Sequence, residues 1–271
     1  MTELTNLFSL KGKTALKQFA QPGMLCLFDF DGTLAPLVAD PVKAMVPHKI
    51  QQRLMQLQAI TQVGIVTGRS LADMYARLEF LPDYLVGNHG VEGLPGWQQH
   101  ADAFYAICRC WHAKLAPEIA AIDKGIQLED KHYSLSLHFR QARDHAAVMK
   151  KLPLLLAELS PSPRVISGKC VFNLLPGHAA DKGYAVSRLI KQAGALRTLY
   201  VGDDVTDEDV FSLRRDDVFS VRVGCEAGPD TTAAMYCIPT VASIEFFLDQ
   251  LVDILSADKF KPAHFNQVNQ R

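Results

Sequence analysis

The sequence predicts an α/β protein with a doubly wound core around a parallel sheet and an inserted α+β cap domain. Two observations carry this prediction. Short apolar runs alternate with amphipathic helical patterns over most of the chain, which is typical of strands joined by crossover helices in a parallel sheet. A segment in the middle alternates apolar and polar residues strictly, which is typical of an antiparallel strand with one buried face.

Five apolar runs predict the strands of the core. Each has the length of a strand and is followed by Gly, Asp or Thr, as expected for strands buried on both faces of a sheet. The runs are Met24 to Phe28, Val63 to Val66, Tyr84 to Val86, Thr198 to Val201 and Phe219 to Val223. We expect amphipathic helices between them, starting near Pro47, after Ser70 and after Asp181.

Residues 94–173 are predicted to form the cap, with residues 1–93 and 174–271 forming the core. Every second residue between Tyr133 and Arg140 is apolar, so this strand should bury one face. Its other face carries polar side chains, namely Ser134, Ser136, His138 and Arg140. We expect Gly168 to Leu175 to be the neighbouring strand, and helices near Ala103 to Leu115 and Asp144 to Leu159 to cover the apolar face.

Composition narrows the classes of function. The 271 residues are 48% hydrophobic with a net charge of −1, which excludes a disordered chain. The absence of a Lys/Arg run argues against nucleic acid as the main partner, because binding to the phosphate backbone needs a basic stripe. Residues 94–173 carry ten Lys or Arg against seven Asp or Glu, so the cap is basic and the core acidic. We therefore expect a small-molecule ligand.

The chain carries no predicted membrane or export signal. No apolar run approaches the roughly 18 residues that cross a bilayer, and no short apolar stretch follows the first residues. The six cysteines contain no C-x-x-C pair, so we expect neither a zinc site nor a disulfide framework. These features predict a cytoplasmic protein.

Acidic residues are concentrated where predicted strands end. Asp29 and Asp31 follow the first core strand in the sequence F-D-F-D-G-T-L. Ligands of open α/β sheets bind at the carboxyl ends of the strands. Two carboxylates there suit a nucleophile beside a general acid/base, or a site for a hard cation. A solvated turn is the alternative for an isolated D-x-D pair.

A second acidic cluster follows the strand that ends near Val201. Thr206 and Asp209 have the T-x-x-D spacing of a capping box, an ordinary helix start that accounts for part of the acidity. Asp203 and Asp204 precede this box, where unpaired carboxylates need a compensating cation. The predicted metal ligands are Asp29, Asp31, Asp203, Asp204 and Asp207.

Two shorter segments complete the pattern. Thr67, Gly68 and Arg69 join a strand end to a helix start, where a hydroxyl and free backbone N–H groups can hold a phosphate. A plain helix cap is the alternative for this segment. Lys182 begins another helix, which is an unfavourable place for a cation unless an anion lies beside it. A solvated surface lysine is the alternative.

In chain order, the four segments are D-x-D-G-T-L, T-G-R, the Lys at a helix start and G-D-D-x-x-D. Together they resemble the haloacid dehalogenase-like (HAD) phosphatase superfamily. The resemblance implies that Asp29 attacks phosphorus to form an aspartyl-phosphate, and that Asp31 protonates the leaving group and then activates water. Thr67 would bind a phosphoryl oxygen and Lys182 would neutralise the carboxylates. Mg²⁺ would be held by Asp29, Asp203 and the backbone carbonyl of Asp31, since oxygen donors favour Mg²⁺ over Zn²⁺.

Within that superfamily, four segments are similar to trehalose-6-phosphate phosphatases: Gly87 to Gly90, Leu128 to Arg140, Gly168 to Val171 and Gly202 to Glu208. The resemblance implies Mg²⁺-dependent hydrolysis of trehalose 6-phosphate, with a trehalose-6-phosphate synthase as the protein partner it suggests. The residues it implies for substrate binding are Gly68, Arg69, Asn88, His89, Glu129, Lys131, Arg140 and Asn173.

The chain departs from this family at one cap position. The family usually has Glu in the stretch V-x-E-x-x-P, whereas this sequence has Asn173. Asn supplies one acceptor and one NH₂ donor in place of two carboxylate acceptors. A HAD phosphatase acting on another disaccharide phosphate or a hexose phosphate is therefore one alternative. A non-catalytic phosphosugar-binding subunit of a synthase complex is the other.

Overall fold

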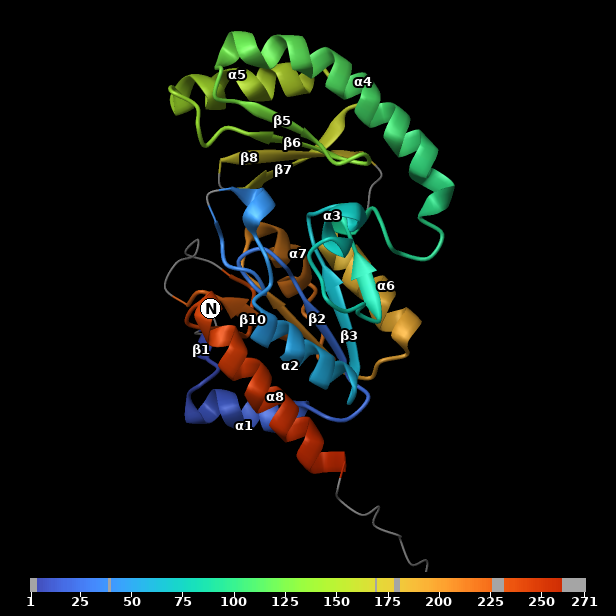
Figure 1. Ribbon diagram of the computed structural model, residues 1–271, viewed down its shortest axis with the longest axis vertical. Helices are drawn as coiled ribbons and strands as arrows, with labels where there is room; N and C mark the ends of the chain where they lie inside the picture. The colour runs from blue at the N-terminus through green and yellow to red at the C-terminus, as the bar shows by residue number, and fades with distance from the viewer. Residues whose placement is uncertain (1–3, 39, 169, 178–180, 226–231, 260–271) are drawn as a thin grey trace, which may run out of the picture.

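The chain folds around two separate sheets, as the computed structural model shows for residues 4–38, 40–168, 170–177, 181–225 and 232–259. A seven-stranded parallel sheet forms the core, and a four-stranded antiparallel sheet with two helices forms a cap above it (Figure 1). All pairs in the larger sheet are parallel and all pairs in the smaller one antiparallel. The predicted fold class is confirmed.

The strands that precede the predicted catalytic residues are neighbours in the core sheet. Its order is β1 (Thr5–Asn6), β11 (Tyr236–Ile238), β10 (Val218–Val223), β9 (Thr198–Gly202), β2 (Leu25–Phe28), β3 (Gln62–Val66) and β4 (Tyr84–Val86). The five predicted strands are confirmed, whereas the two short strands β1 and β11 were not predicted. Because β2 lies between β9 and β3, the residues that follow these three strands meet at one edge.

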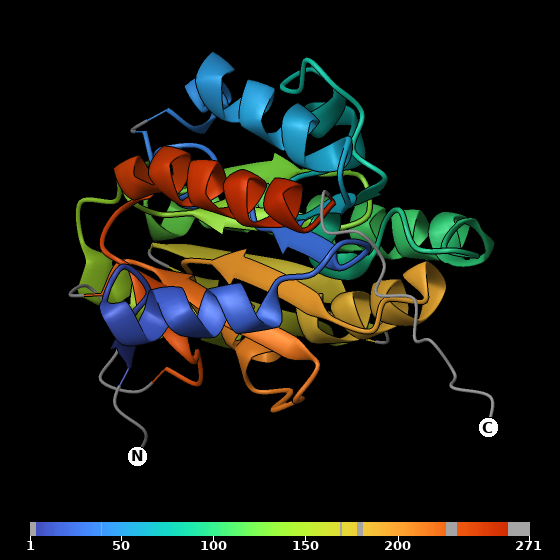
Figure 2. The same cartoon turned by 90° about the horizontal axis from the view of Figure 1, so that it is seen from below.

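Helices cover both faces of the core sheet. The first face is packed against α1 (Leu10–Phe19), α2 (His48–Gln58) and α8 (Ile244–Lys259), and the second against α6 (Lys182–Ala193) and α7 (Glu208–Phe211). Helices α2 and α8 pack side by side (Figure 2). The connections contain α3 (Leu71–Tyr75), η1 (Pro41–Lys43), η2 (Asn88–Gly90), η3 (Val205–Asp207) and η4 (Val241–Ser243). Among the described residues, no helix is long and apolar enough to cross a membrane.

The cap sheet has the order β5 (Gln127–Asp130), β6 (Leu135–His138), β8 (Val171–Pro176) and β7 (Pro163–Gly168). Helices α4 (Gln98–Ile122) and α5 (His145–Ala157) cover its outer face and bury the apolar side of β6. The predicted pairing of β6 with β8 is confirmed, with Ser136 opposite Asn173. The predicted boundary between residues 173 and 174 falls inside β8.

The polar face of β6 is covered at Ser134 and Ser136 but open at its other end, where the His138 side chain is 33% exposed and Arg140 is exposed. Ser134 and Ser136 are each 1% exposed. This face lies against the core, because Ser134 Oγ donates a hydrogen bond to Oδ1 of Asn88 in η2 (2.6 Å). The apolar face of this sheet is therefore covered by the helices of the cap, and its polar face meets the core at Ser134 and Ser136.

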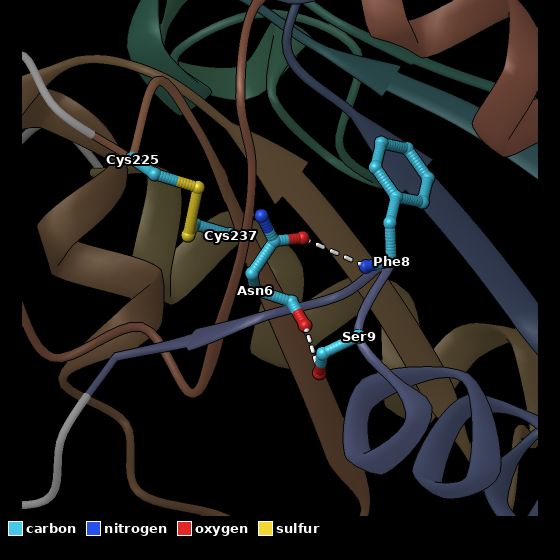
Figure 3. Close-up of a disulfide and its surroundings, with 5 residues drawn as sticks. All are labelled: Asn6, Phe8, Ser9, Cys225 and Cys237. Carbon is cyan, nitrogen blue, oxygen red and sulfur yellow. Dashed lines mark hydrogen bonds between the residues drawn. A yellow bond between two sulfur atoms is a disulfide. The ribbon is translucent and has the colours of Figure 1, made fainter.

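A disulfide joins Cys225 and Cys237, contrary to the prediction drawn from cysteine spacing (Figure 3). The two residues are 12 positions apart, with Cα atoms separated by 5.4 Å. Cys225 follows β10 and Cys237 lies in β11, and these strands are neighbours in the sheet. A short-range motif search could not find the pair, because the parallel sheet brings the two cysteines together.

Candidate active site

Three adjacent strands of the core place the predicted catalytic side chains at one edge of the sheet, beneath the cap (Figure 1). Asp29 follows β2, Thr67 follows β3 and Asp203 follows β9. The backbone N–H of Asp29 still bonds to Val201 of β9 (2.8 Å), so the sheet holds it in register. The turn after β2 therefore presents the Asp29 side chain from the rigid centre of the core.

Lys182 is a buried cation between two carboxylates. Its Nζ donates to Oδ1 of Asp29 and to Oδ1 of Asp207, each at 2.7 Å. The residue is only 2% exposed, which removes the surface-lysine alternative. Burial opposes its charge, but Asp207 and Asp29 raise the pKa of Lys182 above its ordinary value. These contacts explain the cation at the start of α6.

Asp207 holds the loop after β9 in place. Its Oδ1 also accepts a hydrogen bond from the hydroxyl of Tyr200 (2.6 Å), and its Oδ2 accepts from the backbone N–H groups of Asp203 and Asp204 (2.9 Å each). With Lys182 this makes four hydrogen bonds, which matches the acceptor capacity of a carboxylate. Asp207 is fully buried, and its bonds organise the neighbouring acidic residues.

The capping box predicted for Thr206 and Asp209 is wrong. The reciprocal box at the start of η3 is formed by Asp204 and Asp207 instead. The turn begins two residues earlier than the sequence suggested, because the oxygens of Asp207 reach back to the backbone ahead of η3. Asp204 is the N-cap residue of η3, and its backbone N–H is bonded to Asp207.

A group of three carboxylates remains close enough to share a cation. Oxygens of Asp29, Asp203 and Asp207 lie within 4.8 Å of one another. Within the described part of the chain, the structure does not bring the side chains of Asp31 and Asp204 into this group. Asp203 lies directly over Gly32, whose φ of +80° suits glycine and where a Cβ would collide with the carboxylate.

This group carries more negative charge than its one ammonium can balance. Burial, followed by the charge of Asp207, raises the pKa of Asp203 to about 7. Burial also raises the pKa of Asp29 well above its ordinary value, with Lys182 opposing and Asp207 adding to the shift. A cation bound by these carboxylate oxygens would relieve the repulsion between their charges, so the oxygen donors fit Mg²⁺.

The Asp31 side chain pairs with Arg69 rather than with Lys182. Both of its oxygens accept hydrogen bonds from Arg69, Oδ2 from Nε and Oδ1 from Nη2, each at 2.7 Å. Arg69 also bonds to Asp73 (2.8 Å) and to the carbonyl of Pro41 (2.9 Å). Its guanidinium lies 5.1 Å from the ring centroid of Phe30. Arg69, predicted to bind substrate, is thus engaged by the protein itself.

Cap and core are joined beside this edge. Lys131 Nζ from the cap donates to the carbonyl of Gly68 (3.2 Å), and Nδ2 of the buried Asn88 donates to the carbonyl of Lys131 (3.1 Å). Glu129 accepts from His138 (2.8 Å) and lies 3.7 Å from the Lys131 ammonium. The structure therefore groups these four predicted substrate-binding residues around one contact between the domains.

His89 and Asn173 supply further polar groups between cap and core. His89 has φ +58° and is 6% exposed, and its Nδ1 has no hydrogen-bond partner among the described residues. Burial, together with Lys131 and other nearby cations, lowers its pKa well below the ordinary value, so the ring is neutral. Asn173 is engaged by the protein as well: Ser136 donates to its Oδ1 (2.6 Å), and its side chain is hydrogen-bonded to the His89 ring.

Arg140 is not drawn into this region. It lies two residues beyond β6, is exposed, and makes no side-chain hydrogen bond or ion pair with the residues that the structure describes. Arg164 of β7 bridges cap and core instead, bonding to Asp181 (3.0 Å) and lying 3.7 Å from Asp209. No sequence motif marked Arg164. Lys169, within the Gly168 to Val171 motif, lies outside the described residues.

The chain is similar to known proteins over most of its length. The family profile described as Trehalose-phosphatase matches residues 27–236. A trehalose-phosphate phosphatase of Mycolicibacterium paratuberculosis is 32% identical over 242 residues, which cover 84% of this chain and 62% of that protein. The chain thus spans less than two thirds of that relative's length.

Two solved structures share the fold. The C-terminal domain of a C. albicans trehalose-6-phosphate phosphatase has a TM-score of 0.69 at 22% identity, covering 93% of this chain and 98% of that one. A structure titled trehalose-6-phosphate phosphatase related protein has a TM-score of 0.72 at 21% identity, covering 87% and 99%. At these identities the likeness shows the architecture.

Proposed function

The chain belongs to the trehalose-phosphatase family, and from this premise we propose that it hydrolyses trehalose 6-phosphate to trehalose and phosphate with Mg²⁺. One observation carries the proposal. Buried Lys182 bridges Asp29 and Asp207, and Asp203 lies beside them, at the carboxyl ends of adjacent strands. Phosphoryl transfer needs such charge stabilisation and alignment more than it needs a strong base.

Asp29 is the proposed nucleophile. Lys182 holds its carboxylate through Oδ1, which leaves Oδ2 for attack on phosphorus. As the new bond forms, the ester P–O bond breaks and its electron pair stays with the sugar oxygen. Asp31 gives a proton to that oxygen, then removes one from the water that hydrolyses the aspartyl-phosphate. The Thr67 hydroxyl, which follows β3 and is buried, is the proposed contact for a phosphoryl oxygen.

Mg²⁺ would be held by Asp29 and Asp203, with the backbone carbonyl of Asp31 beside them. Asp207 acts differently, because its oxygens already accept four hydrogen bonds and its part is to position Lys182 and the loop. When bound, Mg²⁺ neutralises charge on the phosphoryl oxygens and aligns them. The excess of carboxylates over ammonium groups supports this assignment.

Cap and core together supply the proposed substrate contacts. Lys131 brings a cation to the backbone of Gly68, next to Thr67, where it suits the phosphate end of the substrate. Neutral His89 lies between these groups, with its Nδ1 buried and without a hydrogen-bond partner among the described residues. Glu129, beside Lys131, adds carboxylate oxygens that accept from hydroxyl groups. A cytoplasmic location and a synthase partner remain predictions of the sequence.

Asn173 favours a second candidate substrate class, another disaccharide phosphate. Asn173 has one acceptor oxygen and one NH₂ donor where the family usually has two acceptors, and Ser136 already donates to that oxygen. A mismatched hydrogen bond in a closed site costs about 1 to 3 kcal/mol, or roughly tenfold to a hundredfold in specificity. The chemistry at Asp29 would be the same for either sugar.

Phosphate release from trehalose 6-phosphate, sucrose 6-phosphate and glucose 6-phosphate, each with Mg²⁺ or with EDTA, tests the proposal. We expect Mg²⁺-dependent release that is fastest from trehalose 6-phosphate. Equal rates on all three substrates would reject the assigned sugar while keeping the phosphatase chemistry. No release from any of them would favour a binding subunit.

A further inference from the structure

The pairing of Arg69 with Asp31 is a planar fork that the proposed mechanism leaves unexplained. Nε and Nη2 of the guanidinium meet the two carboxylate oxygens at 2.7 Å each. Paired N–H···O bonds of this kind fix the orientation of a carboxylate as well as its charge. The Arg69 side chain is 11% exposed, so water competes little for its N–H groups.

A second arginine, Arg77, supports the pair of Arg69 and Asp31 through Asp73. Asp73 accepts from Nη1 of Arg69 (2.8 Å) and is itself held by Nε and Nη2 of Arg77 (2.8 and 2.7 Å). Arg77 in turn donates to the backbone carbonyls of Val42 and Ala44 (2.9 and 2.6 Å). Two carboxylates and two guanidiniums therefore alternate, and the chain of bonds ends on backbone.

Direct binding of the substrate phosphate is the competing role for Arg69. A guanidinium has five N–H donors, and four of them are used on Asp31, Asp73 and the carbonyl of Pro41. The charge of Arg69 is likewise compensated by two carboxylates. Only one N–H, on Nη1, remains for an incoming phosphate, so a paired contact with Arg69 would displace a carboxylate, whereas Lys131 already lies at the Gly68 backbone beside Thr67.

Building on the proposed function, we propose that Arg69 is the positioning residue of the acid–base step. Asp31 passes its proton to the sugar oxygen as the ester P–O bond breaks and the electron pair stays on that oxygen. Asp31 is left as a carboxylate, and the Arg69 fork fixes the orientation of its two oxygens. The same fork then holds the carboxylate that removes a proton from water.

A comparison of leaving groups separates this role from phosphate binding. p-Nitrophenolate is a weak base that departs without a proton, whereas a sugar alkoxide needs one. We expect Arg69→Gln to lower kcat/KM on the sugar phosphate by about a hundredfold, the scale of general acid catalysis. On p-nitrophenyl phosphate the loss should be severalfold at most. kcat/KM reports the steps up to leaving-group departure, so later hydrolysis of the intermediate does not enter.

Three further variants tie the effect to Asp31. Arg69→Gln in an Asp31→Asn background should add little to the loss on the sugar phosphate, because Arg69 acts through Asp31. Arg69→Lys should recover only part of the rate, since an ammonium cannot form the fork. Asp73→Asn, which keeps Arg69 but removes charge from its anchor, should cause a smaller loss with the same dependence on leaving group.

Arg215→Gln is the matched control, because Arg215 forms the same fork with Asp217 at an exposed site (2.8 and 2.6 Å). It should change neither substrate's kcat/KM. Equal losses on both esters in Arg69→Gln, or in Asp73→Asn should Arg69→Gln fail to fold, would overturn the positioning role. A wild-type enzyme that cleaves glucose 6-phosphate but not trehalose 6-phosphate would reject the proposed sugar only, and the comparison would then use glucose 6-phosphate.

Discussion

Two charge clusters lie at the same edge of the core sheet and differ in their balance. Around Lys182, two buried carboxylates, Asp29 and Asp207, share one ammonium, and the half-buried Asp203 lies within 4.8 Å of them. Around Arg69, two carboxylates meet two guanidiniums, and the network ends on backbone carbonyls. The first cluster is short of positive charge and fits a cation and a phosphoryl group. In the second cluster the positive and negative charges balance, which suits a network that orients a neighbouring side chain.

We call the carboxylates around Lys182 the unbalanced cluster and those around Arg69 the balanced cluster. The largest effect is expected from the proposed nucleophile of the unbalanced cluster. Asp29→Asn removes the attacking carboxylate at nearly constant shape, so turnover should fall by at least about a thousandfold. The melting temperature should stay near that of the wild type. Phosphate release measures the change, with the exposed Asp217→Asn as control. A correctly folded variant within tenfold of wild-type turnover would reject Asp29 as the nucleophile.

Removing the cation of the unbalanced cluster should cost stability as well as activity. Lys182→Met leaves Asp29 and Asp207 buried without a counter-charge, which costs about 3 kcal/mol or more. Urea unfolding measures the difference. Lys191→Met, at the exposed end of the same helix, should stay within about 0.5 kcal/mol of wild type. A similarly small change in Lys182→Met would contradict the buried network.

Added Mg²⁺ should stabilise the unbalanced cluster. At about 100 times its dissociation constant, a bound ion adds about 2.7 kcal/mol. For a chain of this size, that corresponds to about 5 to 10 °C in melting temperature. Asp203→Asn should lose most of this shift in a thermal melt with and without EDTA, whereas Asp217→Asn should keep it. An equal shift in both variants would place the ion elsewhere.

The balanced cluster should give the smallest effect, and one that depends on pH. Burial opposes the charge of Asp73, but hydrogen bonds from Arg77 and Arg69 lower its pKa below the ordinary 3.8. Its contribution to stability is therefore complete above pH 4 and is lost as the pH falls through the lowered pKa. Asp73→Asn should cost about 1 to 2 kcal/mol at pH 7, the scale of a charged hydrogen bond.

Urea unfolding at several pH values measures this contribution. The difference between wild type and Asp73→Asn should be constant from pH 5 to 8 and should shrink below about pH 4, where the wild type also loses the charge. A difference that grows on acidification would contradict the sign assigned to Asp73.

The sequence predicted those features that local patterns encode. Apolar runs predicted five of the seven core strands, and the acidic pairs at their ends predicted which side chains meet, because parallel strands end at one edge. The pairing of Lys182 with Asp29 spans 153 positions, yet a cation at a helix start was a sufficient local signal for an acidic partner.

Other features depend on tertiary contacts and left no such signal. The partner of Arg69 is 38 residues away, and nothing in the T-G-R stretch distinguishes a bond to Asp31 from a bond to phosphate. Tyr200 belongs to an apolar run, so its hydrogen bond to Asp207 was hidden. The disulfide follows from the adjacency of β10 with a three-residue strand that was not predicted.

The central claim is that the unbalanced cluster carries the covalent step, and mass spectrometry of the acid-quenched enzyme tests it most directly. Asp31→Asn lacks the proposed base for hydrolysis, so the intermediate should accumulate with p-nitrophenyl phosphate and Mg²⁺. We predict the mass of one phosphoryl group on the peptide that contains Asp29, and none when Asp29→Asn is added. A phosphoryl group on another residue, or none while nitrophenol is released, would contradict the account.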